Sequence, residues 1–160
     1  NVHIVVNISA SGSIIPKTMM TRGAVVTTLV DLLECRRIPV AVTLVDVSTH
    51  TQKIVTSVRL KDYTQPLDTD RLAYFLGHPS VLRRLVFSQM ENEPKNIRDA
   101  IGVTNGGYGQ PVDLDKEHEL RRDSLYFPGM IFGDHQWSSP RAAATFTLET
   151  LAKLGIEMDV

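Results

Sequence analysis

Three short oxygen-bearing side chains follow the first apolar segment of the chain. Residues 2–6 form a largely β-branched apolar run, which is typical of a strand buried on both faces of a parallel sheet. Asn7, Ser9 and Ser11 come next, and their alternate spacing directs them to one side if the segment stays extended. Because ligands bind at the carboxyl ends of strands in open α/β sheets, we expect a binding site here. The alternative is a turn in which the serines bond local backbone groups.

The run Asn7-Ile8-Ser9-Ala10-Ser11 resembles the metal-ion-dependent adhesion site of von Willebrand factor A-like (integrin inserted-domain-like) domains. In that family a strand ends in Asp-x-Ser-x-Ser, and later Thr and Asp residues complete a Mg²⁺ site. Here an amide stands at Asn7 in place of the first carboxylate. The resemblance implies that Ser9 and Ser11 bind the metal directly, while Asn7 and Asp134 hold bound waters.

The Thr ligand implied by the same resemblance falls near Gln65-Pro66-Leu67, where the family often has Thr-Pro-Leu. Thr69 and Thr64 are the two candidates, and either could be a plain helix cap instead. With Asp134 as the one evident anion, Mg²⁺ binding should be weak, because desolvating a dication against one carboxylate is costly. The alternative is a metal-free hydrogen-bonded cluster that ties three loops together.

An enzyme would require a different use of the same residues. Ser9 or Ser11 could act as a nucleophile with His135 as its base. Asp134 is adjacent to His135 in a predicted strand end, so the two side chains point to opposite faces and Asp134 cannot easily orient the imidazole. No Gly-x-Ser-x-Gly elbow is present. We therefore expect a non-enzymatic interaction or scaffold domain that binds a protein partner.

The predicted elements follow the doubly wound α/β pattern. Strands are expected at 2–6 and 40–47, joined by a helix over about 18–37. Residues 48–52 are too few for another crossover, so the strand at 54–61 should return antiparallel at the edge of the sheet. Gly23 inside the first helix suggests a close approach to the sheet. With the resemblance, these elements imply a three-layer, mostly parallel von Willebrand A-like sheet with one antiparallel edge strand and helices on both faces.

The second half of the chain is less regular. Residues 91–123 are polar and rich in glycine, which predicts an irregular excursion with a short helix near 116–122. The last major strand is expected to start near Met130, flank the first strand and end at Asp134. A helix should then begin at Pro140. We interpret residues 1–160 as a single domain and, because the chain starts directly at a strand, as a fragment of a longer protein.

The composition of the chain limits the kinds of partner and the location that can be expected for it. A net charge of −1 gives no general electrostatic attraction to nucleic acid or anionic membrane, and no apolar run reaches the length of a membrane span. The single cysteine, Cys35, cannot form an internal disulfide, which favours a cytoplasmic location. Residues 22–26, 67–73 and 78–84 also resemble uncharacterised bacterial mobile-element and phage proteins. This likeness suggests a component of such an assembly as an alternative role.

Overall fold

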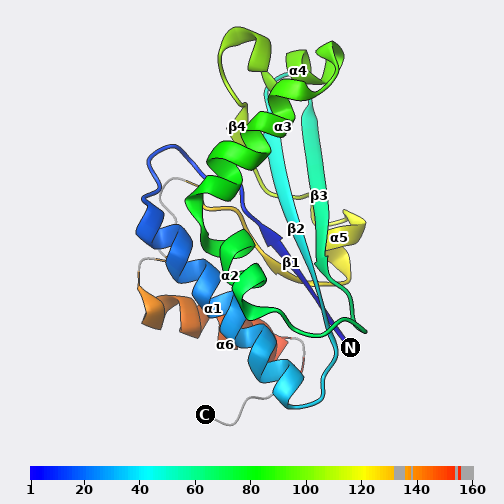
Figure 1. Cartoon of the computed structure of the whole chain (residues 1–160), viewed down its shortest axis with the longest axis vertical. Helices are drawn as coiled ribbons and strands as arrows, with labels where there is room; N and C mark the ends of the chain where they lie inside the picture. The colour runs from blue at the N-terminus through cyan, green and yellow to red at the C-terminus, as the bar shows by residue number, and fades with distance from the viewer. Residues whose placement is uncertain (132–135, 138, 154, 156–160) are drawn as a thin grey trace.

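The structure is a computed structural model of the chain, and it describes residues 1–131, 136, 137, 139–153 and 155. These residues form a mixed β-sheet packed against helices (Figure 1). The elements, in chain order, are β1 (Val2–Asn7), α1 (Pro16–Cys35), β2 (Val40–Thr49), β3 (Lys53–Lys61), α2 (Thr69–Gly77), the π-helix η1 (Val81–Val86), α3 (Phe87–Asn92), α4 (Lys95–Ile101), the 3₁₀-helix η2 (Val103–Asn105), β4 (Gln110–Pro111), α5 (Glu119–Arg122), β5 (Leu125–Phe127) and α6 (Pro140–Lys153).

β1 lies inside the sheet, whose strand order in the described part of the chain is β3-β2-β1-β5. It pairs in parallel with β2 on one side and with β5 on the other. β3 returns antiparallel to β2, which confirms the prediction drawn from the short polar turn. The two-residue strand β4 also pairs antiparallel with the end of β2, and the sequence pattern did not predict it. The carboxyl ends of β1 and β2 therefore meet at one end of the sheet.

The two faces of the sheet are covered unequally. Ile4, Val6 and Leu44 face a large core built with residues of α1, α2, η1, α3, α4 and α6. Val5, Val45 and Val47 face a small cluster closed by Leu114, with Leu120 of α5 packed against it. The expectation of helices on both faces is thus met on the second face only by the four-residue α5 and the segment before it.

Gly23 is explained by contact between two helices and not, as expected, by contact with the sheet. α1 and α2 lie side by side (Figure 1). A Cβ atom added at Gly23 would lie 2.3 Å from the Cα atom of Gly77 at the end of α2. No side chain fits at that distance, so glycine at position 23 sets how closely α2 approaches α1.

Two boundaries differ from the sequence-based expectation. The segment 91–123 is more regular than expected, since it contains α4, η2, β4 and α5. The strand beside β1 starts at Leu125, earlier than the predicted Met130, and it ends at Phe127 just before Pro128. Met130 then forms a single parallel bridge with Ala10, so the segments that follow β1 and β5 remain side by side beyond the two strands.

Candidate functional site

Asn7, the last residue of β1, is fully buried and uses both ends of its side-chain amide. Its Nδ2 donates to the carbonyl of Val112 at 2.9 Å and lies 3.1 Å from Tyr126 Oη and 3.2 Å from Asp113 Oδ1. Its Oδ1 accepts the backbone N–H of Ser9 at 3.0 Å. Asn7 therefore joins the end of β1 to the segment that follows β4.

Ser9 turns toward β2 and bonds groups there. Its Oγ donates to Asp46 Oδ1 at 2.9 Å and accepts the backbone N–H of Val47 at 2.7 Å. The other carboxylate oxygen of Asp46 accepts the Ser48 hydroxyl at 3.2 Å. Ser9, Asp46 and Ser48 are all buried. Sequence analysis missed Asp46, although an acidic residue within a buried apolar strand was a signal for a bonded polar group.

Burial disfavours the ionised form of the Asp46 carboxyl group. It raises the pKa of this carboxyl above its ordinary value, and the hydrogen bonds from Ser9 and Ser48 oppose that rise without cancelling it. The carboxyl is thus held beneath the helix layer in an environment that disfavours its ionised form.

Arg22 of α1 brings a buried positive charge to the same end of the sheet. It is only 1% exposed, and its Nη1 donates to the carbonyl of Asn7 at 2.6 Å and to that of Pro128 at 3.2 Å. The sequence offered no sign of this role, because Arg22 looks like an ordinary polar residue on an amphipathic helix. Its guanidinium holds the backbone of β1 against the chain after β5.

Asp113 closes the cluster from the opposite side. Its Oδ1 accepts the Tyr126 hydroxyl at 2.9 Å and the backbone N–H of Gly129 at 2.8 Å. Burial raises the pKa of Tyr126, so its phenol remains a proton donor. The structure thus gives Asp113 a hydrogen-bonding role in the cluster.

The structure describes four of the five predicted metal ligands, Asn7, Ser9, Ser11 and Thr69. Asn7 and Ser9 come together as expected. Ser11 continues along the chain, where its backbone N–H donates to the carbonyl of Met130 at 2.9 Å. Thr69 is the exposed first residue of α2, where the adjacent Asp68 serves as the cap, and no hydrogen bond among the described residues links Thr69 to Asn7 or Ser9. Asp134 lies outside the described residues.

Hydrogen bonds within the chain already engage the side-chain oxygens of Asn7 and Ser9 that the resemblance assigns to a Mg²⁺ site. A Mg²⁺ ion needs oxygen lone pairs directed at it in near-octahedral geometry. Here Asn7 Oδ1 and Ser9 Oγ both accept backbone N–H groups, and the Arg22 cation already lies against the Asn7 carbonyl. Within the described residues, no group of three or more His, Cys, Asp or Glu side chains could hold a metal ion.

A separate feature lies at the β3 edge of the sheet, where a pocket of about 150 Å³ opens between the strands and the helix layer. Asp46 and Leu44 of β2 contribute to its lining, together with Val81 and Val86 of η1 and Phe75 of α2. Exposed side chains also line it: Val58 is 46% exposed and Leu85 is 50% exposed. A π-helix is an uncommon element that recurs at functional sites, and here η1 supplies part of the pocket lining.

The backbone of β3 is open along its outer side. Among the described residues, β3 pairs only with β2, and no other backbone or side-chain hydrogen bond reaches the backbone of residues 54–60. Alternate N–H and C=O groups of an edge strand point away from the sheet and are ready to pair with another strand. The pocket and the open strand edge are adjacent because Thr56 and Val58 belong to both.

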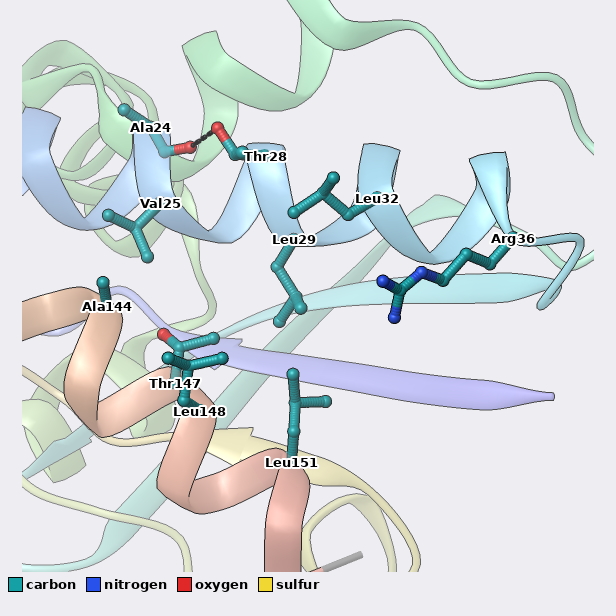
Figure 2. A pocket seen from close by; sticks show the side chains of 10 residues that line it. All are labelled: Ala24, Val25, Thr28, Leu29, Leu32, Arg36, Ala144, Thr147, Leu148 and Leu151. Carbon is teal, nitrogen blue, oxygen red and sulfur yellow. Dashed lines mark hydrogen bonds between the residues drawn. The ribbon is translucent and has the colours of Figure 1, made fainter. Parts of the chain in front are cut away.

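An apolar groove of about 420 Å³ lies between α1 and α6 (Figure 2). Leu29 and Leu32 line one side and Leu148 and Leu151 the other. The hydroxyls of Thr28 and Thr147 are engaged with carbonyls of their own helices at 2.9 and 2.8 Å. Ligand sites combine apolar walls with a few polar groups that can bond the ligand, whereas these two hydroxyls are bonded to their own helices.

The described fold is that of an α/β domain with a mixed sheet. A family model described as a domain of unknown function, DUF7192, matches residues 1–158, so the chain belongs to this family. Comparison with curated proteins gives no match, and comparison with solved structures gives none either. No helix in the described part of the chain combines the length and apolar character that crossing a membrane requires.

Proposed function

We propose that this chain is a non-enzymatic protein-interaction domain that binds an extended polypeptide segment along β3. The observation that carries the proposal is the unpaired outer edge of β3 beside a pocket with the exposed side chains of Val58 and Leu85. Extended peptides add to such edges through main-chain hydrogen bonds, and neighbouring pockets select their side chains. The strand order with β3 antiparallel at the edge also supports a relation to von Willebrand A-like domains.

A binding role is favoured over hydrolysis by the state of Ser9. A nucleophilic hydroxyl must be accessible to a substrate. The Ser9 residue is 1% exposed, and its hydroxyl is engaged by Asp46 and by the backbone of Val47. His135, the predicted base, lies outside the described residues.

Metal-independent action is supported by Arg22. A cation at the strand ends offsets the partial negative charge of the carbonyls that converge there, and Arg22 supplies one from within the chain. We therefore place partner binding at β3, and we assign a structural role to the strand-end cluster formed by Asn7, Ser9, Arg22 and Asp113.

Two features of β3 discourage unspecific pairing with other strands, although no described strand pairs with its outer edge. Its register with β2 shifts at Leu60, which has no Cα partner, and Arg59 beside it is exposed. Bulges and edge charges are devices that prevent unspecific strand addition. A partner therefore has to match residues 54–59, and this requirement suits a specific binding site.

The test is a selection of random ten-residue peptides displayed on phage against the immobilised chain, followed by amide hydrogen exchange with the enriched peptides. We expect slower exchange at residues 54–60 and weaker binding after Leu85→Ser. Leu32→Ser is the matched control, since Leu32 is a similarly exposed leucine, at 44%, in the groove between α1 and α6. If no peptide is enriched, or if the enriched peptides protect other residues and bind Leu85→Ser normally, the proposed function is wrong.

A further inference from the structure

We infer that the segment bound along β3 places an aliphatic side chain in the pocket beside Val58 and an acidic side chain next to it in sequence, opposite Arg59. This inference rests on the proposed function and adds the chemistry of the partner. It follows from the charges of β3, from the faces its residues occupy, and from the size and polarity of the pocket.

The charge of β3 selects an acidic partner. The strand contains three basic residues and no acidic residue. Lys53 is paired with Asp115 at 2.7 Å, and Lys61 is paired with Glu34 at 2.5 Å. Arg59 is exposed and forms no ion pair within the described residues. It is therefore the basic side chain of β3 that remains available to a carboxylate on a neighbouring strand.

The same charges argue against a second copy of the chain as the partner. Pairing of one β3 with another would give Arg59 no acidic partner, because β3 contains no acidic residue. Like charges opposite each other on neighbouring strands are destabilising, whereas opposite charges are favourable. A different segment that carries an acidic residue is the better match.

Strand geometry fixes the spacing of the two recognised side chains. Val58 lies opposite Leu44 and lines the pocket on the helix-covered face, whereas Arg59 lies opposite Thr43 on the other face. An added strand alternates between the same two faces. The side chain that enters the pocket and the one that meets Arg59 are therefore neighbours in the partner's sequence.

The pocket selects an aliphatic side chain. A volume of about 150 Å³ is enough for a benzene-sized apolar group, and thus for the side chain of Leu, Ile or Met. Each oxygen of the Asp46 carboxyl group already accepts a hydrogen bond within the chain, one from Ser9 and one from Ser48. The remaining lining is largely apolar, with Leu44, Phe75 and Val81 in contact with the space.

The experiment repeats the peptide selection with the wild-type chain and with Arg59→Glu as separate targets. We expect peptides enriched by the wild type to carry Asp or Glu beside Leu, Ile or Met, and those enriched by Arg59→Glu to carry Lys or Arg there. For one wild-type peptide, replacing its acidic residue by Lys should weaken binding to the wild type about tenfold, and Arg59→Glu should restore it. Replacing its pocket residue by Ala should weaken binding about 50-fold.

The controls separate the two proposals. Thermal unfolding and far-UV circular dichroism establish that Arg59→Glu is folded, and Arg59→Gln tests loss of charge without reversal. Peptides that protect residues 54–60 but show no acidic preference, or bind the wild type and Arg59→Glu equally, would overturn the inference and leave the proposed function standing. Enriched peptides that protect no residue of β3 would refute both.

Discussion

Replacing Asn7 by Asp tests whether the strand-end cluster is a hydrogen-bonded structural unit or an adhesion site with a missing carboxylate. The substitution changes the Asn7 donor into an acceptor among three acceptors, one of which is Asp113 Oδ1 at 3.2 Å. At an effective dielectric constant of about 20, two carboxylates at that separation repel each other by about 5 kcal/mol. The introduced carboxyl can escape this repulsion by taking up a proton.

Protonation sets an upper limit on the cost. Holding an Asp with an ordinary pKa of about 3.9 in its protonated form at pH 7 costs about 4 kcal/mol. We therefore expect Asn7→Asp to lower the free energy of unfolding by about 2–4 kcal/mol at pH 7. The folded state raises the pKa of the introduced carboxyl, so the charge penalty is full above that folded pKa. It disappears as the pH falls toward the unfolded pKa, leaving about 1 kcal/mol for the altered hydrogen bonds.

The assay is urea unfolding of the wild type, Asn7→Asp and Asn7→Leu between pH 4 and 7, with and without Mg²⁺. Asn7→Leu removes the same hydrogen bonds without adding a charge, so its deficit should change little with pH. An adhesion site would behave differently, because Asn7→Asp would gain Mg²⁺ affinity and be stabilised by the ion. Recovery of wild-type stability in Mg²⁺, or a deficit that does not shrink toward pH 4, would refute the reasoning.

Three further substitutions probe the buried groups. Asp46→Asn should flatten the decline of the free energy of unfolding with rising pH, because the raised pKa of Asp46 costs stability as pH rises from the unfolded to the folded value; denaturant titrations at pH 4 and 7 check this, and an unchanged pH dependence contradicts it. Arg22→Met should cost about 2–5 kcal/mol in the same assay, since it leaves the Asn7 and Pro128 carbonyls without their donor; a neutral effect would exclude the structural role. Gly23→Ala should cost about 2 kcal/mol in calorimetry despite its better helix propensity, because its Cβ would overlap Gly77, whereas Gly12→Ala, with open space around it, is the control.

Much of the sheet was predictable because its signals are local. Residues 2–6 and 40–47 are mostly apolar, and they form β1 and β2, two interior strands that pair in parallel with each other. The short turn before residue 53 forces β3 to return antiparallel, whatever the rest of the chain does. Asp68 caps α2 by accepting the backbone N–H of Arg71 at 2.9 Å, a role that is typical of Asp before a helix.

The boundaries and coverage of the sheet were less predictable. Pro128 and Gly129 suggested a late start for the last strand, yet β5 lies before them, because pairing with β1 selects Leu125–Phe127. The apolar stripe of a helix shows that it packs, but it does not show on which face of the sheet. In the folded chain nearly all helices pack against one face of the sheet, and α5 and the segment around Leu114 cover the other face.

The candidate site likewise has one part that the sequence determined and another that only the tertiary structure decided. Sequence alone determined that Asn7 and Ser9 stand at the end of a central strand, because strand length and alternation are properties of neighbouring residues. Only the tertiary structure decided what they bond: Asp46 from the next strand, Asp113 from a distant loop and Arg22 from α1. Such partners are up to about a hundred residues away, and burial, which makes each unpaired polar group costly, selects them only once the whole chain has packed. The edge position of β3 was expected from the sequence, whereas the pocket beside it exists only because η1 and α2 pack over β2 and β3.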